Sequence, residues 1–141
     1  MCSTFPTSSK TVLFNGTSAP ISIAQLLVQG GGGGFDDSFN LQIAVITENC
    51  NKLTTFNLSF NVPPNSKLNG TFDIKDFFDA GTGDCFGSIL EQNVSPISQN
   101  LFTLSSGKVI VIDKGNKLYN LNVTTVPLGQ STFTLSGDVQ F

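Results

Sequence analysis

The stretch LTTFNLSFNV, residues 53–62, decides the fold class of this chain. Its apolar residues Phe56, Leu58, Phe60 and Val62 alternate strictly with polar residues. Because successive side chains of a β-strand point to opposite faces, this alternation predicts a strand with one buried and one solvated face. The most regular segment of the sequence is therefore a half-buried strand.

Similar segments lie on both sides of this stretch. The expected strands are residues 11–14, 39–47, 53–62, 67–74, 108–113, 118–126 and 131–141. The turn at Pro63–Pro64 predicts a hairpin between the third and fourth of them, and the turns after residues 113 and 126 predict a C-terminal meander.

Short alternating strands separated by frequent turn signals are typical of two packed sheets or a barrel. We predict an all-β fold, a two-sheet antiparallel β-sandwich of roughly seven to nine strands, with a closed β-barrel as the alternative. The core is expected to be rich in Phe, which occurs 13 times. The predicted inward residues include Phe56, Phe60, Tyr119, Leu121, Phe133 and Leu135, with Asn57, Asn122 and Thr134 outside.

Residues 22–29 fit two structures. A strand is compatible with them, but Ser22 as an N-cap, a run of helix formers from Ala24 and the terminator Gly30 favour one short N-terminal helix. The five glycines at positions 30–34 interrupt regular structure, because ordering glycine costs much backbone entropy. We therefore expect an N-terminal arm with a Gly-rich hinge at residues 1–34 and the β-sandwich domain at residues 35–141.

The charge pattern argues against several classes of partner and chemistry. All seven basic residues are lysines, the net charge is -3, and there is no His. Nucleic-acid binding needs clustered positive charge, so no nucleic-acid partner is expected. Without His, Ser-His-Asp catalysis and His-containing zinc sites are excluded. The chain also has no apolar run long enough to predict a transmembrane segment.

Cys2, Cys50 and Cys85 are the three cysteines. The spacing of the last two fits no metal motif, and in an oxidising compartment it predicts a Cys50–Cys85 disulfide; two buried free thiols are the alternative. Cys2 directly follows Met1, where the lipid-bearing first residue of a mature lipoprotein would stand if Met1 replaced a signal peptide. Cys2 is therefore the lipidation candidate.

The only candidate metal ligands are Asp73, Asp76, Asp79 and Asp84, which lie close together in the sequence. Calcium takes oxygen ligands from such clusters, but a solvated acidic loop explains the same residues. No catalytic residue and no cofactor-binding residue is predicted. Five Asn-x-Ser/Thr triplets also occur, at Asn15, Asn57, Asn69, Asn93 and Asn122, and follow either from glycosylation or from a composition rich in Asn, Ser and Thr.

The C-terminal half resembles a known group of proteins. The runs LSSGKVIV (residues 104–111), KGNKLY (114–119) and LSGDV (135–139), with LNGTF (68–72) after a Pro-Pro turn, are similar to the β-rich C-terminal domains of secreted Bacteroidota lipoproteins. Those domains have no characterised activity. The resemblance implies a surface-anchored or periplasmic β domain and supplies no catalytic residues.

These observations lead to an expected function. The chain is expected to be a non-enzymatic binding or scaffolding domain, a lipoprotein of the bacterial cell surface or periplasm, with carbohydrate or protein subunits as its partners. The first alternative is a subunit of a virion or another structural assembly, because sheet edges recruit neighbouring strands. The second is a carbohydrate-active enzyme that uses carboxylates near Asp79.

Overall fold

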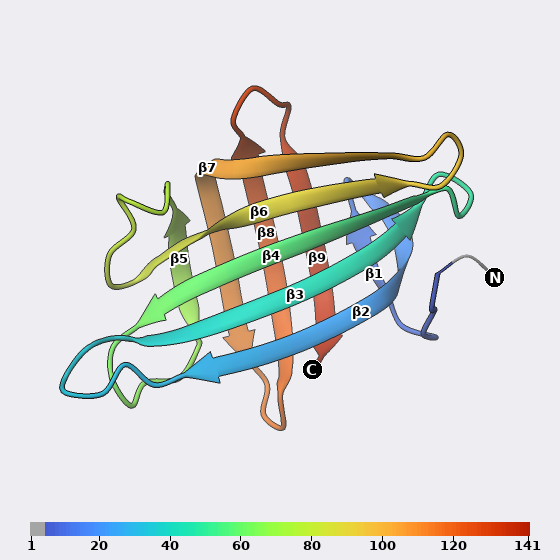
Figure 1. Ribbon diagram of the computed structural model, residues 1–141. Helices are drawn as coiled ribbons and strands as arrows, with labels where there is room; N and C mark the ends of the chain where they lie inside the picture. Colours follow the sequence, from blue (N-terminus) through green and yellow to red (C-terminus); the bar gives the residue numbers. More distant parts are fainter. Residues whose placement is uncertain (1–4) are drawn as a thin grey trace.

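A computed structural model describes residues 5–141, which form nine strands (Figure 1). The strands are β1 (Thr11–Phe14), β2 (Thr17–Gln29), β3 (Asp37–Thr47), β4 (Lys52–Val62), β5 (Gly70–Ile74), β6 (Asp84–Asn93), β7 (Ser98–Asp113), β8 (Leu118–Pro127) and β9 (Phe133–Gln140). No helix occurs in this part of the chain. The all-β prediction and the expected number of strands are confirmed.

The strands are arranged in two layers that cross at a steep angle, and one continuous ring of hydrogen bonds joins the layers (Figure 1). One layer contains most of β2, then β3, β4, β6 and the start of β7; the other contains β5, the rest of β7, β8, β9 and β1. The ring has the connectivity of a closed barrel, and the two layers enclose the core as in a sandwich.

The two longest strands, β2 and β7, pass from one layer to the other. β2 pairs with β1 up to Pro20 and with β3 from Ile21 onward, and its register shifts between Ile21 and Ile23. β7 pairs with β6 up to Thr103 and then with β8, with a shift next to Leu104. Such bulges bend a strand, which lets one strand form a corner between layers.

The ring closes where the two ends of the sheet meet. β1 pairs with β9 through Leu13 opposite Ser136 and Phe14 opposite Leu135. Asn15 strengthens this contact, because its side-chain oxygen accepts the Thr134 N–H at 2.8 Å and its own N–H donates to the Thr134 carbonyl at 2.9 Å. Residues near the start of the chain are thus fixed to the last strand.

The core lies between the layers, and the predicted alternation holds. Phe56, Phe60, Tyr119, Leu121, Phe133 and Leu135 are all buried, whereas Asn57, Asn122 and Thr134 are not. The β7–β8–β9 meander is also confirmed. Aromatic rings contact one another across the core, as between Phe60 and Phe72, whose ring centres are 5.0 Å apart.

Two local predictions are wrong. Residues 22–29 belong to strand β2 and not to a helix, because pairing with β3 buries Ala24 and Leu26 in part with the strand's period of two. The hairpin between β4 and β5 does not form either. β4 pairs with β3 and β6, whereas β5 pairs with β7 and, in parallel, with β6.

The expected division at residues 34 and 35 falls in the turn between β2 and β3. Strands β1 and β2 belong to the same ring as the rest of the chain, and their residues Val12, Ala19 and Ile21 lie in the core. Because five glycines interrupt the chain after the arm, we expect the amides of residues 1–34 to exchange faster than those of the rest, and this stays a prediction.

Candidate functional site

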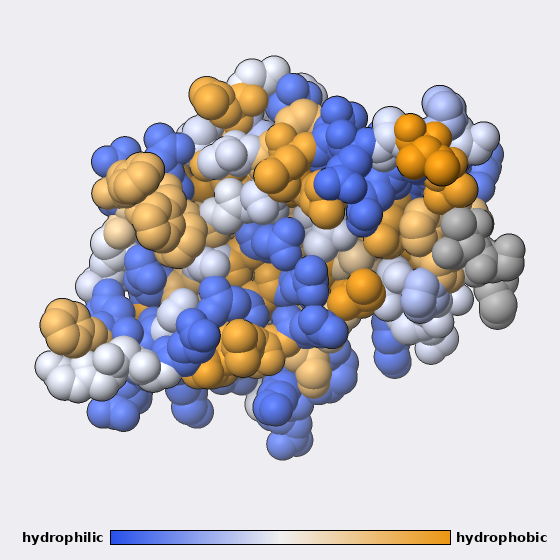
Figure 2. Space-filling view, viewed as in Figure 1, coloured by the Kyte–Doolittle hydropathy of each residue, from blue (hydrophilic) through white to orange (hydrophobic). Residues whose placement is uncertain are grey.

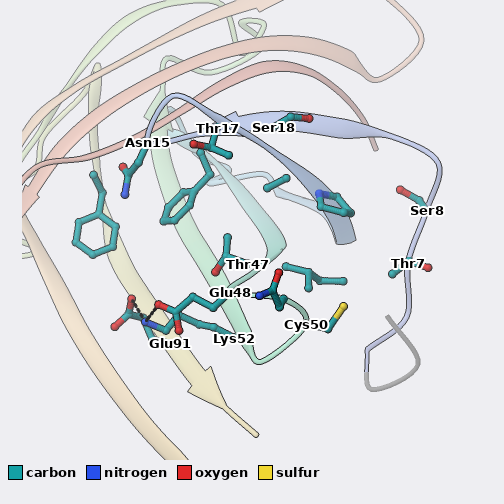
Figure 3. A pocket seen from close by; sticks show the side chains of 16 residues that line it. Thr7, Ser8, Asn15, Thr17, Ser18, Thr47, Glu48, Cys50, Lys52 and Glu91 are labelled. Atoms are coloured by element: carbon teal, nitrogen blue, oxygen red, sulfur yellow. Dashed lines mark ion pairs between the residues drawn. The ribbon is translucent and has the colours of Figure 1, made fainter. Parts of the chain in front are cut away.

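A pocket of about 820 Å³ opens at one end of the ring, between the start of β2 and the end of β3 (Figure 3). Its walls come from Thr7 and Ser8, from the β1–β2 hairpin, from the β3–β4 turn, and from β6 and β9. We call it the rim pocket. Its volume lies in the range of about 300–1,000 Å³ that is usual for small-molecule sites.

The pocket follows from the way β2 changes partners. Residues 17–20 pair only with β1, and pairing with β3 starts at Ile21 opposite Val45. The start of β2 and the end of β3 therefore separate at the rim. Pro20 has no backbone N–H that could donate a hydrogen bond to β3. On the other side, the Ser8 hydroxyl and backbone N–H both donate to the Ile21 carbonyl at 3.0 Å, which holds the N-terminal segment beside the opening.

Aromatic rings form the floor of the rim pocket. Phe14 and Phe133 line it, with ring centres 6.1 Å apart. Phe14 also contacts Phe56 at 5.9 Å, and Phe133 contacts Phe102 at 6.2 Å. The floor is therefore continuous with the core, and its rings are held in place by packing on both sides.

A lysine between two glutamates lies in the wall of the rim pocket. The Lys52 ammonium is 3.1 Å from the Glu48 carboxylate and 3.5 Å from the Glu91 carboxylate, as the dashed lines in Figure 3 show. The side chains of Lys52 and Glu91 are only 19% and 15% exposed. An ion pair so far removed from water is screened less than a surface pair.

The two carboxylates decide the charge state of the lysine. Burial lowers the pKa of the Lys52 ammonium, but hydrogen bonds and charge from Glu48 and Glu91 outweigh burial, so the pKa is raised above its usual value. With one positive and two negative groups, the cluster carries a net charge of -1. It therefore offers both donors and acceptors to a ligand and disfavours an anion.

The β3–β4 turn that carries Glu48 has an unusual backbone. Glu48, Asn49 and Cys50 all have positive φ angles, of 53°, 53° and 69°. This conformation costs a non-glycine residue roughly 1–2 kcal/mol. Asn51 ties the turn to the β6–β7 turn, because its side chain accepts the Ser95 N–H at 2.9 Å. Strain held in place by neighbouring contacts is a recurrent feature of binding sites.

A buried hydroxyl lies one step deeper along β4. Thr54 is fully buried, and among the residues that the structure describes its hydroxyl has no hydrogen-bond partner. By strand alternation it shares the inner face with Lys52 and Phe56, and it is directly opposite Glu91. The polar character of this end of the core thus extends below the ion pair.

The predicted Cys50–Cys85 disulfide is wrong. Cys85 is a free, fully buried thiol opposite Phe60 on β4, and burial raises its pKa. Cys50 lies in the β3–β4 turn next to Lys52, at the other end of the same strand. Lys52 and Phe60 are eight positions apart along β4, which is roughly 26 Å at the usual rise of a strand. Cys50 and Cys85 are therefore far apart. The lipidation candidate Cys2 lies outside the described residues.

The four predicted calcium ligands surround the β5–β6 connection, away from the rim pocket. Within residues 5–141, no group of three acidic or cysteine side chains is close enough to hold a metal ion. Asp84 instead accepts the Gly81 N–H at 2.9 Å, and the Asp76 carbonyl accepts the Asp79 N–H at 2.9 Å. In this structure the two residues stabilise turns.

Sequence reasoning missed Glu48, Lys52 and Glu91. Each is a charged residue at or near a strand end, where solvated side chains are common, and nothing in their spacing links them. The pairing of β4 with β6 brings Lys52 and Glu91 together, and the β3–β4 turn brings Glu48 to Lys52; no local sequence pattern indicates either contact.

Comparisons with protein-family models, with curated proteins and with solved structures find no match for this chain. In the part of the chain that the structure describes, no helix is long and apolar enough to cross a membrane.

Proposed function

We propose that this chain is a non-enzymatic binding domain that works outside the cytoplasm, on the bacterial cell surface or in the periplasm, and that the rim pocket holds its ligand. The observation that carries the proposal is the Lys52 ion-pair cluster above a floor of Phe rings. Pockets with apolar walls and a few fixed polar groups are the usual sites for small ligands.

The chemistry of the pocket favours a neutral carbohydrate. Phe14 and Phe133 offer apolar surface for the C–H face of a sugar ring, while Thr17, Thr47 and other hydroxyl and amide side chains surround them. Glu48 and Glu91 can accept hydrogen bonds from sugar hydroxyls, and Lys52 can donate to them. An anionic ligand would meet the net negative charge of the cluster, which lowers its affinity.

An NMR titration tests the proposal: oligosaccharides are added to the isotope-labelled protein, and the chemical shifts of its backbone amides are recorded. A panel of neutral oligosaccharides should include one that shifts the amides of residues 47–52, whereas acidic oligosaccharides should not. Glu91→Gln should weaken binding about tenfold or more, because a hydrogen bond to a charged group is lost. Asp138→Asn is the matched control, since Asp138 forms an exposed ion pair outside the pocket.

Two outcomes would contradict the proposal. The first is that no panel member shifts the amides around the rim pocket. The second is that Asp138→Asn weakens binding as much as Glu91→Gln does.

The lipoprotein part of the proposal rests on the resemblance described above. Mass spectrometry of the protein from its native host, compared with a Cys2→Ser variant, would detect the lipid.

A further inference from the structure

In the ring, part of one strand pairs with a neighbour on one side only. Residues 22–29 of β2 pair with β3 on one side, and within residues 5–141 no strand pairs with their other side. We call this side the β2 edge. In Figure 1 it forms the lower margin of the front layer. Alternate residues of such an edge direct their backbone N–H and C=O groups away from the sheet, where another strand can bind them.

The β2 edge lacks charged residues and proline, which usually prevent pairing, and the bulge of β2 is confined to its start, between Ile21 and Ile23. Residues 22–29 (SIAQLLVQ) contain no charge and no proline. Leu27 and Val28 are 59% and 50% exposed, and Figure 2 shows apolar patches along this margin, separated by hydrophilic side chains. The strand is therefore long, apolar and open.

Two other free edges of the ring are less suited to pairing. Residues 137–140 of β9 include the charged Asp138, which forms an ion pair with Lys114 at 2.9 Å. Charged residues on an edge disfavour pairing. Residues 98–103 of β7 are fewer and begin with three polar residues. The Thr103 carbonyl already accepts a hydrogen bond from the Leu128 N–H at 3.0 Å. The β2 edge is thus the strongest candidate among the three.

We propose that the β2 edge binds the β2 edge of a second copy of this chain, in an antiparallel pair about a two-fold axis. An uncharged strand presents no like-charge repulsion to its own copy, and an antiparallel pair of identical strands is self-complementary. An axis at Gln25 puts Ile23 of one copy opposite Leu27 of the other, and Ala24 opposite Leu26. Apolar residues then face each other on both sides of a continuous intermolecular sheet.

This inference does not depend on the ligand of the rim pocket. The pocket lies at the start of β2, before residue 21, whereas the β2 edge begins after it. A dimer formed in this way leaves both pockets open.

Sedimentation velocity and light scattering over a wide range of concentrations test the proposal on the full chain. The wild-type protein should form a dimer and no larger species. Leu27→Lys should raise the dimer dissociation constant by about tenfold or more, because in each copy it replaces the apolar neighbour of the other copy's Ile23 with an ammonium group. Leu101→Lys is the matched control, since Leu101 is a 65% exposed leucine on the free edge of β7, and it should leave the dimer intact.

Hydrogen exchange of the wild-type protein gives a second readout that needs no variant. Amides of residues 22–29 should exchange more slowly at high than at low concentration, and those of residues 98–103 should not change. A monomer at every concentration would overturn the proposal. Dissociation by Leu101→Lys alone, or chains of copies that grow with concentration, would overturn it as well.

Discussion

Lys52 on β4 and Glu91 on β6 form an ion pair of 3.5 Å between neighbouring strands, at a point where both side chains are largely shielded from water. The two residues are 39 positions apart in sequence but are brought together because β4 pairs with β6 and not with β5. This contact links the stability of the rim to the shape of the pocket.

Replacing Lys52 with Gln should lower the free energy of unfolding by about 1–2 kcal/mol, because it leaves two carboxylates without their shared cation. Urea unfolding measures the change. Lys67→Gln is the control, since Lys67 is exposed on the β4–β5 connection and should change stability by under about 0.5 kcal/mol. Equal losses in the two variants would contradict the prediction.

The same ion pair predicts a pH dependence at alkaline pH. The folded-state pKa of Lys52 is raised above 10.5, so its stabilisation is complete below that pH and is lost as the pH rises through the folded-state pKa. Unfolding curves should therefore show the difference between wild type and Lys52→Gln shrinking above about pH 10.5. The pKa of Tyr119 is also raised, by burial and by the charge of Asp113. Tyr119 titrates in both proteins, so its contribution to the pH dependence cancels when the two are compared.

Cys85 should not react with thiol reagents in the native state, because it is fully buried and its pKa is raised by burial. Mass spectrometry after labelling should find Cys85 modified only in denaturant. Rapid labelling of Cys85 in the folded protein would show that β4 and β6 open readily at this position.

Phe133→Ala should cost roughly 3–5 kcal/mol, because it removes a buried ring that contacts both Phe14 and Phe102. Thr134→Ala, whose side chain points to the other face of β9, should cost under about 0.5 kcal/mol. Urea unfolding of both variants compares the two faces directly. Similar costs would mean that the register of β9 is wrong.

Asp138 should have a pKa below its usual value, because Asn120 and Lys114 donate hydrogen bonds to its carboxylate at 2.9 Å. Its contribution to stability is present above the unfolded-state pKa and is lost as the pH falls through the folded-state pKa. Asn120→Ala should move the pKa of Asp138 up toward 3.8, as followed by carboxyl NMR titration. An unchanged pKa would show that the hydrogen bond is absent in solution.

The strands with strict alternation were predictable from sequence, and those without it were not. β4, β8 and β9 each bury one face, so their apolar residues recur at every second position. β6 gave no signal, because Gly87 interrupts its inner face and Glu91 and Asn93 follow at the rim. β2 was misread because the adjacent residues Leu26 and Leu27 lie on opposite faces of the strand, Leu26 packed against the core and Leu27 exposed.

The candidate site was not predictable for a related reason. Lys52 and Glu91 continue the inner faces of β4 and β6 beyond the last apolar residue, where a charge looks like the end of a strand. Only the order of strands in the ring shows that the two charges meet. Cys85 illustrates the same limit, because its burial depends on β5 lying beside β6.

The pairing of Asn15 with Thr134 joins residues 119 positions apart. The ribosome synthesises β1 long before β9, so β1 cannot pair with β9 until nearly the whole chain has been made. Until then the β2–β3–β4 part of the core faces solvent, and contacts so distant in sequence form slowly. During synthesis, the incomplete chain therefore exposes core phenylalanines that favour aggregation until β9 is made and pairs with β1.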